Sequence, residues 1–478
     1  MPPSPGSTAW SDLVEWNVEV DFLVAKKKPG KVYTAETGKR DRWACPANED
    51  NPTETCVQHV AEHVAATLGT KGYAVGGVAY ADASDSDGLS FTIEKPNRKA
   101  DVKGVDPCMQ YWFIGPAPDA IAKPESPDEY DWVGVRLRCP YRSLLSVYHA
   151  DRFGEKNLGQ GVTSNRPTIP PFRGFIEIEK VLGLLRAGFK LHVNSTCRLR
   201  VYMNLQHDGL DLTEAKKAIT LAWLLEPDLL LPLRPNTKDR TLSHCLPITM
   251  ESKLAKRPSR FPANISASLS QEVRERLLAQ SGPLFPVDME LMDSHIPSMI
   301  KSRIQERIHM IWATSTLEEL SNALKNLHGE TTLSLNIHNK YHPTLVFQYG
   351  VWHPQREDMQ YWVQLLGRLF LFAVASTPTR FKQAVLNLEY NAVGLQHMNR
   401  VDRCKTMLTL SFDHAMGYYW DQLKENERGN GCLSPKNLDR QGILPPMRGI
   451  DYDTDAQVQS GSSSSFSNGN GSGLWIGN

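Results

Sequence analysis

Two carboxylates, Glu19 and Asp21, stand two residues apart in a segment (18–22) where apolar and acidic residues alternate. Residues i and i+2 of a β-strand point to the same face of a sheet, about 7 Å apart. Paired carboxylates of this kind can hold one or two Mg²⁺ ions, hard cations that also take phosphate oxygens as ligands. The same alternation is typical of a strand with a wet, acidic face, so both interpretations stand at this point.

A second pattern with chemical potential is His59-Val-Ala-Glu62-His63, which matches the H-x-x-E-H motif of inverted zinc peptidases. A zinc site would also need a cleft and a distant third ligand. Val60 and Val64 give this segment an apolar stripe, so we expect a solvated helix face here. The sequence contains no P-loop, no G-x-S-x-G and no G-x-G-x-x-G after a predicted strand.

The elements that must position these residues mix strands and helices. Period-two alternation predicts strands over 18–22, 133–137, 198–204 and 344–348. Helical spacing predicts helices over 53–68 and 300–311, another from Thr316 to about residue 329, and one carrying Trp362. A further helix begins at Asp211, where Glu214 completes a capping box. Because strands and helices do not alternate strictly, we expect an α+β fold around a largely antiparallel sheet packed with helices.

Charge and composition narrow the classes of partner. The 478 residues contain 53 Lys and Arg against 53 Asp and Glu, and a neutral chain lacks the basic surface of general nucleic-acid or membrane-surface binders. The sequence contains no run of about 18 apolar residues, so it predicts no transmembrane helix. The start MPPSPGSTAW does not resemble a signal peptide. The cysteines form no close pair, which favours reduced thiols. We therefore expect a cytoplasmic protein without nucleic-acid or membrane partners.

The domain organisation follows from composition. We expect residues 1–10 to form a flexible leader, and residues 451–478 to form a disordered Ser/Gly-rich tail, because the tail has too little apolar content to fold. Between them no low-complexity linker or fixed-period repeat occurs, so residues 11–450 are predicted to form one domain.

Several segments follow one another in a recognisable order. The first three are Val18-Glu19-Val-Asp21-Phe22, then Asp119-Ala-Ile121 after an aromatic stretch, then Gly134-Val-Arg136-Leu-Arg-Cys139-Pro140. The next three are Asn194-Ser-Thr-Cys197-Arg-Leu-Arg200-Val-Tyr202, then Glu226-Pro-Asp-Leu with Arg240 and Pro247 beyond it, then Thr344-Leu-Val346-Phe-Gln348 before a tryptophan-containing helix. In this order, across roughly residues 14–375, the chain resembles the amidoligase family of ATP-dependent carboxylate–amine ligases.

The resemblance implies a fold related to glutamine synthetase and glutamate–cysteine ligase, in which a curved antiparallel sheet holds ATP and Mg²⁺ on its concave face. It implies a reaction in which ATP phosphorylates a carboxylate and an amine then attacks the acyl phosphate to form an amide. The substrates would be a small-molecule carboxylate and an amine or peptide. Glu19, Asp21 and Asp119 take the positions of metal ligands.

The departures from the family pattern fall on charged positions. Arg136 replaces a glutamate, Arg200 and Tyr202 replace two histidines, and Val346 and Gln348 replace a glutamate and an arginine. An arginine beside two carboxylates would repel Mg²⁺ rather than coordinate it. Arg136, Arg200 and Arg240 could instead form a basic floor that binds ATP or another anion.

Three functions remain open from the sequence. The chain is an active but divergent ligase, a non-catalytic relative that binds a nucleotide or other anion through its arginines, or an interaction protein that docks a partner on an aromatic-rich surface. The sequence favours a divergent or inactive amidoligase-like protein and assigns no catalytic residue. It does not decide whether the chain is an enzyme.

Overall fold

The computed structural model describes residues 14–33, 41–70, 77–81, 91–94, 111–143, 173–205, 209–233, 245–256, 289–297, 302–326, 330–337, 343–352, 356–394, 420–421, 423, 438–439 and 442–447. The predicted leader, the predicted tail and Arg240 lie outside these ranges.

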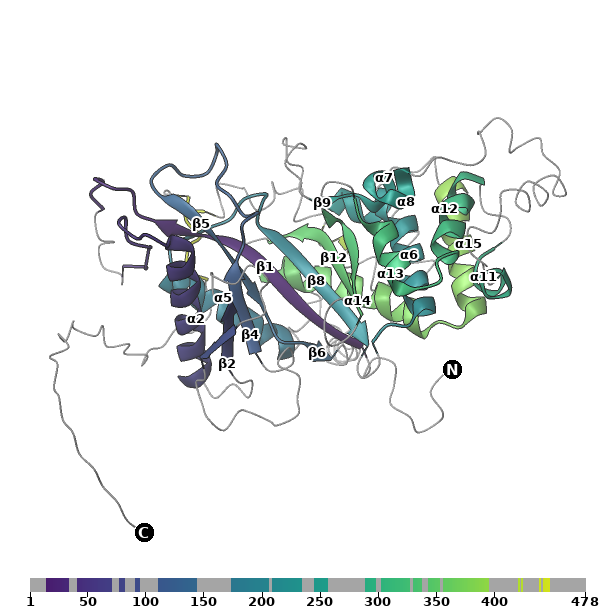
Figure 1. The fold of residues 1–478 in the computed structure, drawn as a ribbon, viewed down its shortest axis with the longest axis horizontal. Coiled ribbons are helices and arrows are strands. Elements are labelled where there is room, and N and C mark those ends of the chain that lie inside the picture. Colours follow the sequence, from purple (N-terminus) through teal and green to yellow (C-terminus); the bar gives the residue numbers. More distant parts are fainter. Residues whose placement is uncertain are drawn as a thin grey trace, which may run out of the picture.

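A large sheet forms the centre of the described structure (Figure 1). Its strands are β1 (Val14–Lys26), β2 (Gly77–Ala81), β3 (Phe91–Glu94), β4 (Tyr111–Pro116), β5 (Asp131–Arg138), β6 (Arg142–Ser143), β7 (Leu191–His192), β8 (Arg198–Leu205), β11 (Leu333–Asn336) and β12 (Thr344–Val351). They run in the order β11-β12-β8-β1-β5-β4-β2-β3, and β6 and β7 also pair with β1. Apart from the parallel pair β2 and β4, neighbouring strands are antiparallel. The predicted α+β class with a largely antiparallel sheet is confirmed.

Helices flank the sheet and gather into a group at one end of it, on the right in Figure 1. They are α2 (Pro52–Thr70), α5 (Arg173–Gly188), α6 (Leu212–Leu225), α7 (Ile248–Glu251), α8 (Lys253–Lys256), α11 (Met289–His295), α12 (Ser302–Trp312), α13 (Leu317–Leu324), α14 (Arg356–Ala375) and α15 (Pro378–Gly394). Short turns, η1 (Glu226–Leu230) and η2 (Leu231–Leu233), follow α6, and a small parallel pair joins β9 (Cys245–Leu246) to β10 (Glu330–Thr331). None of these helices has the length and apolar composition required to cross a membrane.

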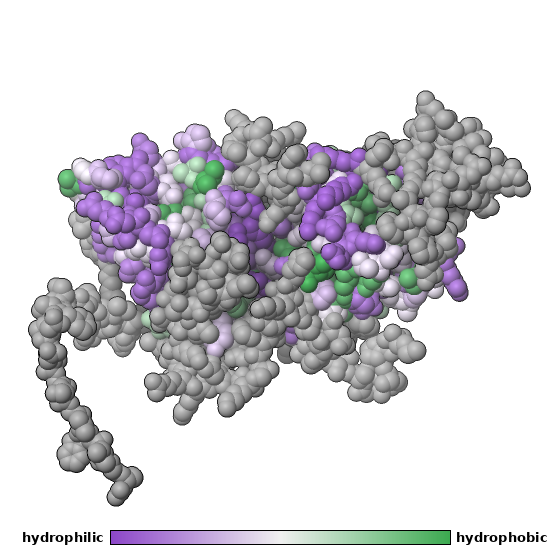
Figure 2. Space-filling view, in the orientation of Figure 1, coloured by the Kyte–Doolittle hydropathy of each residue, from purple (hydrophilic) through white to green (hydrophobic). Residues whose placement is uncertain are grey.

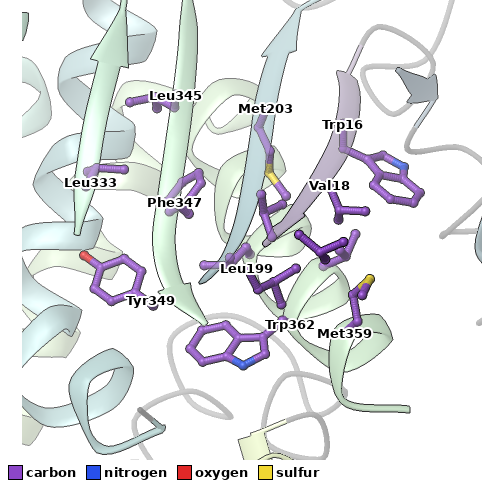
Figure 3. Close-up of a cluster of buried hydrophobic side chains, with 14 of the residues drawn as sticks. Trp16, Val18, Leu199, Met203, Leu333, Leu345, Phe347, Tyr349, Met359 and Trp362 are labelled. Atoms are coloured by element: carbon purple, nitrogen blue, oxygen red, sulfur yellow. The ribbon is translucent and has the colours of Figure 1, made fainter. Parts of the chain in front are cut away.

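One face of the sheet is apolar and carries the main core. Alternation along β1 places Trp16 and Val18 on this face, beside Leu199 and Met203 of β8 (Figure 3). Trp362 of α14 packs on the same cluster, so α14 covers this half of the sheet. Burial of such large side chains contributes roughly 1.5–3 kcal/mol each. The period-two pattern therefore fixes which side of each strand faces the helices.

Local sequence signals set the helix ends. The Asp211 side chain caps α6 by accepting from the backbone N–H of Glu214 at 2.6 Å, and the Glu214 side chain accepts from the backbone N–H of Asp211. The predicted capping box is confirmed. Thr316 caps α13 as predicted, but this helix ends at Leu324, before the predicted end near residue 329. It ends early because Lys325 adopts an extended conformation, with φ −64° and ψ 148°.

Two lysines of α6 tie neighbouring helices together. Lys216 Nζ donates to the carbonyl of Trp312 at the end of α12, at 2.8 Å. Lys217 Nζ donates to the carbonyl of Ser376, just past the end of α14, also at 2.8 Å. Both ammonium groups lie where helix C-termini leave carbonyls unsatisfied and carry partial negative charge. These contacts hold the helical group against α6.

Residues near the end of the described chain return to the sheet. Arg42 donates to the carbonyl of Leu444 at 2.6 Å and pairs with Asp439 at 3.1 Å. The N–H of Leu444 donates to Leu191 in β7, and His192 bonds the carbonyl of Gly442 at 2.8 Å. This C-terminal segment thus packs beside β1, far in sequence from the strands that it contacts.

Candidate functional site

The second face of the central strands is polar. On β1 it carries Glu15, Asn17, Glu19 and Asp21, which alternate with the apolar residues of the core. β1 lies between β5 and β8, so its carboxylates have neighbours on both sides. Figure 2 shows hydrophilic side chains in a hollow near the middle of the view, in front of the sheet in Figure 1.

Strand register brings opposite charges together on this face. Glu19 lies opposite Arg200 of β8 and Arg138 of β5, and Asp21 lies opposite Arg136 of β5. Directly opposed pairs in antiparallel strands have Cβ atoms about 4.5–5.5 Å apart, within reach of a carboxylate and a guanidinium. The pairing of three strands therefore assembles an ion cluster, which we call the β1 ion cluster and define as these five residues.

Arg200 sits at the centre of the β1 ion cluster. Its Nη1 lies 2.7 Å from Glu19 Oε1, 3.0 Å from Asp21 Oδ2 and 3.2 Å from Asp21 Oδ1. Its Nε donates to Gln348 Oε1 of β12 at 3.2 Å. The side chains of Arg200, Glu19 and Asp21 are only 4%, 6% and 0% exposed. The acidic face that the sequence predicted as wet is buried, because guanidinium groups lie against its carboxylates.

Arg136 lies at the outer edge of the cluster. Its Nε bonds Asp21 Oδ1 at 2.9 Å and lies 3.2 Å from Glu19 Oε1. Its side chain is 29% exposed, and its Nη1 and Nη2 have no hydrogen-bond partner in the part of the chain that the structure describes. Arg136 therefore uses its inner edge to hold the carboxylates and keeps its two terminal amino groups available.

Aromatic and amide groups complete the surroundings. Tyr202 donates to Glu19 Oε2 at 2.9 Å, and its ring lies 4.3 Å beneath the Arg138 guanidinium. Arg138 also donates to the hydroxyl of Tyr141 at 3.1 Å. Asn17, with its amide oxygen toward Arg138, accepts from Nε at 3.0 Å. Arg138 and Asn17 were not predicted to belong to the site, although their alternation with buried apolar residues places both on this face.

The protonation of the cluster follows from these contacts. Burial alone would raise the pKa of Glu19, but Arg136, then Arg200 and Arg138, outweigh it and hold this pKa below its ordinary value of 4.5. Burial, aided by the charge of Glu19, raises the pKa of Tyr202. Tyr202 thus remains a hydrogen-bond donor at neutral pH, and Glu19 remains a carboxylate.

The oxygens at this site do not fit a resident Mg²⁺ ion. Every carboxylate oxygen of Glu19 and Asp21 already accepts from Arg136, Arg200 or Tyr202. Mg²⁺ needs near-octahedral oxygen ligands at about 2.0–2.1 Å, and an ion there would lie against two guanidinium groups. Within the described ranges, no group of three His, Cys, Asp or Glu side chains is placed to hold a metal.

Asp119, the third predicted metal ligand, joins the polar face by a different route. Its carboxylate lies 3.3 Å from Arg198 of β8 and is 43% exposed. The turn that carries it packs on β5 at Gly134, where a Cβ would lie 2.1 Å from the carbonyl oxygen of Ala117. Only glycine permits that approach. The structure thus places Asp119 beside Arg198, not among the carboxylates of the ion cluster.

The segment after Asp119 is tied to the turn before β8. Thr196 Oγ1 accepts from the N–H of Ile121 at 3.1 Å, and Asn194 Nδ2 donates to the carbonyl of Ile121 at 2.8 Å. Asn194 Oδ1 in turn accepts from the N–H of Thr196 at 2.8 Å. These hydrogen bonds fix the conformation of the turn that precedes β8, so Asn194 and Thr196 have a structural role.

Glu226, another position of the family pattern, is fully buried and lies in a separate hydrogen-bond cluster. Its Oε2 accepts from the N–H and the hydroxyl of Thr249, and its Oε1 accepts from the N–H of Ile248 and the hydroxyls of Thr332 and Tyr349. These bonds tie η1 to α7 and to the edge of the sheet. Glu226 therefore stabilises the junction between the sheet and the helical group.

The H-x-x-E-H motif lies on α2, as predicted, but its histidines have different surroundings. His59 is half exposed and its ring lies 4.5 Å from that of Trp43. His63 is bonded to the carbonyl of Leu184 in α5 at 3.2 Å, and burial lowers its pKa. One histidine thus lies on the expected helix surface, and the other packs between two helices.

Comparisons with protein-family models, with curated proteins and with solved structures give no match to this chain.

Proposed function

We propose that this chain is a non-catalytic protein on an amidoligase-like sheet, and that it binds an oxyanion through Arg136. The ligand class is a phosphate or carboxylate group, such as a nucleotide phosphate. Binding needs no divalent metal, and no residue of the chain is assigned to bond formation. The proposal adopts the second of the three functions left open by the sequence.

The proposal is based on the two edges of the Arg136 guanidinium, of which one contacts carboxylates and the other is available. Its Nε faces Glu19 and Asp21, while Nη1 and Nη2 lack partners within the described residues. The planar guanidinium edge matches two oxygens of a carboxylate or phosphate. Because the buried carboxylates hold its inner edge, Arg136 loses little conformational freedom when an anion binds.

The exposure of Arg136 favours an anion as well. Three guanidinium groups, those of Arg136, Arg138 and Arg200, lie against the carboxylates of Glu19 and Asp21. Arg136 is the most exposed member of the central ion pairs. An approaching anion would therefore meet a guanidinium group first.

Support for the amidoligase-like fold comes from where the resembling segments lie. The segments with Glu19, Arg136, Arg200 and Gln348 occupy the adjacent strands β1, β5, β8 and β12, all in contact through one polar face. The segment of Asp119 packs against the start of β8. Segments that are scattered in the sequence thus converge on the face that would hold ATP in that family.

The occupied carboxylates favour the non-catalytic alternative over an active ligase. The acyl-phosphate reaction depends on metal ions to neutralise charge on the transferred phosphoryl group. Here the charge of Glu19 and Asp21 is neutralised by Arg136 and Arg200 instead. Anion binding requires only the groups that are already in place.

The test is a thermal-melt and calorimetric titration with ATP, inorganic phosphate and glutamate, each with and without Mg²⁺. We expect at least one of these anions to raise the melting temperature by the same amount with and without Mg²⁺, since a ligand stabilises the state that binds it. Arg136→Lys keeps the charge against Asp21 but removes the planar fork, so we expect it to weaken binding about tenfold.

The matched control is Arg380→Lys, which makes the same change on an exposed arginine of α15. It should leave anion binding unchanged. No stabilisation by any of the three anions, or equal binding by the Arg136→Lys variant and the wild type, would refute the proposal. A shift that appears only when ATP and Mg²⁺ are present together would favour the ligase alternative.

A further inference from the structure

A single nitrogen in the ion cluster has the surroundings of a bound cation. Arg200 Nη1 lies within 3.2 Å of Glu19 Oε1 and of both carboxylate oxygens of Asp21. All three side chains are buried. Several oxygens from two carboxylates around one positive centre are the ligands that hard cations take in proteins.

We propose that the Arg200 guanidinium is a built-in substitute for a divalent cation at this position, and that it covers a latent cation site formed by Glu19 and Asp21. The wild-type protein then binds no divalent ion there, and its polar face is assembled in the absence of metal. Removing the Arg200 guanidinium opens the site on the side of β8, while Arg136 Nε still lies against Asp21 Oδ1 and Glu19 Oε1 on the side of β5. The inference concerns the buried centre of the cluster and does not depend on anion binding at Arg136.

Charge balance supports the substitution. Two buried carboxylates without counter-ions would be strongly unfavourable, so some cation must accompany them. Arg200 supplies one positive charge at the centre of the cluster, and Arg136 supplies a second from its outer edge. Because Arg200 is covalently part of β8, its effective concentration at the site is high and no ion from solution is required.

The geometry also predicts which ion the opened site prefers. The oxygens lie 2.7–3.2 Å from the position of Nη1. Ca²⁺ binds oxygens at about 2.3–2.6 Å with flexible geometry, whereas Mg²⁺ demands about 2.0–2.1 Å and an octahedron. Contraction onto Ca²⁺ is the smaller change, so we expect Ca²⁺ and the similar lanthanide ions to bind better than Mg²⁺.

Two neighbours assist the opened site. Gln348 Oε1 accepts from Arg200 Nε at 3.2 Å, which places a neutral amide oxygen beside the site. Tyr202 donates to Glu19 Oε2 at 2.9 Å, which places a phenol ring beside the site. Tyrosine near a bound Tb³⁺ sensitises the luminescence of that ion, so Tyr202 provides a local reporter.

The experiment titrates Tb³⁺ into the full chain and excites tyrosine, with Ca²⁺ and Mg²⁺ as competitors. We expect no saturable emission from the wild type at the site. Arg200→Ala should give saturable emission with an affinity at least tenfold above any binding by the wild type. Ca²⁺ should displace Tb³⁺ at lower concentration than Mg²⁺, and adding Asp21→Asn or Tyr202→Phe should remove the signal.

Folding of the variants is measured in parallel by thermal melting. Arg200→Ala leaves buried carboxylates short of one counter-ion, so we expect its melting temperature to fall and Ca²⁺ to restore part of the loss. Arg200→Gln, which fills more of the space and adds an amide oxygen, provides a second variant with the same expected response.

Two outcomes would overturn the inference. One is Tyr202-dependent Tb³⁺ emission from the wild type, since the guanidinium would then not exclude the ion. The other is the absence of Ca²⁺-dependent stabilisation and emission in both Arg200 variants. Neither outcome affects the Mg²⁺-free anion titrations of the wild type and the Arg136→Lys variant, because Arg200 is unchanged in both proteins and no divalent ion is present.

Discussion

Replacing Glu226 tests how the junction between the sheet and the helical group is held. Its carboxyl group accepts from the N–H groups of Ile248 and Thr249 and from three hydroxyls nearby. Glu226→Ala removes all these acceptor positions and leaves a small cavity. The N–H of Ile248 retains a bond to Thr332 Oγ1 at 3.2 Å, but Glu226 is the acceptor that the structure shows for the N–H of Thr249.

The magnitude follows from these partners. A buried polar group that loses its partner costs about 1–3 kcal/mol, and the hydroxyls can rotate toward new partners. Together with the cavity, we expect Glu226→Ala to lower the free energy of unfolding by roughly 2–4 kcal/mol. In Glu226→Gln, the amide oxygen can accept from the N–H and the hydroxyl of Thr249, while the amide nitrogen donates to the hydroxyls of Thr332 and Tyr349. That variant should cost only about 1 kcal/mol.

The assay is urea unfolding monitored by tryptophan fluorescence, with Glu251→Ala as the matched control. Glu251 is a glutamate of the same region whose carboxylate pairs with Lys256 on the partly exposed surface, so its loss should cost less than about 1 kcal/mol. The reasoning fails if Glu226→Ala costs less than 1 kcal/mol. It also fails if Glu226→Gln is as damaging as Glu226→Ala, because hydrogen-bond direction would then not explain the junction.

Two further predictions concern pH. The neighbouring arginines hold the pKa of Glu19 in the folded protein below 4.5, its ordinary value. The stability that Glu19 contributes is therefore present above pH 4.5 and is lost as the pH falls through the folded-state pKa. In Glu19→Gln, the free energy of unfolding measured by urea should decrease less steeply with falling pH in that range. Burial lowers the pKa of Lys217 to about 8, from 10.5, so the unfolded chain holds this proton more tightly. The contribution of Lys217 to the free energy of unfolding should therefore increase between pH 8 and 10.5. In Lys217→Met, the free energy of unfolding should lack this increase. An equal pH dependence of that free energy in both proteins would contradict the assignment.

Much of the local structure could be predicted from the sequence. The alternation along β1 gave the strand and placed Glu19 and Asp21 on one face, because successive side chains of a strand point to opposite sides. The capping box at Asp211 and Glu214 gave the start of α6, because that signal lies within four residues. Such features depend on neighbours in the chain, so no tertiary information was needed.

The partners of the two carboxylates were decided by the tertiary structure. Arg136 and Arg200 lie more than a hundred residues from β1, and they meet Asp21 and Glu19 only because β5 and β8 pair with β1 in one particular register. A shift of one residue in either strand would turn its arginine to the apolar face. The sequence supplied the carboxylates and the arginines as possible ligands, whereas strand pairing determined that the acids face guanidinium groups and are buried by them.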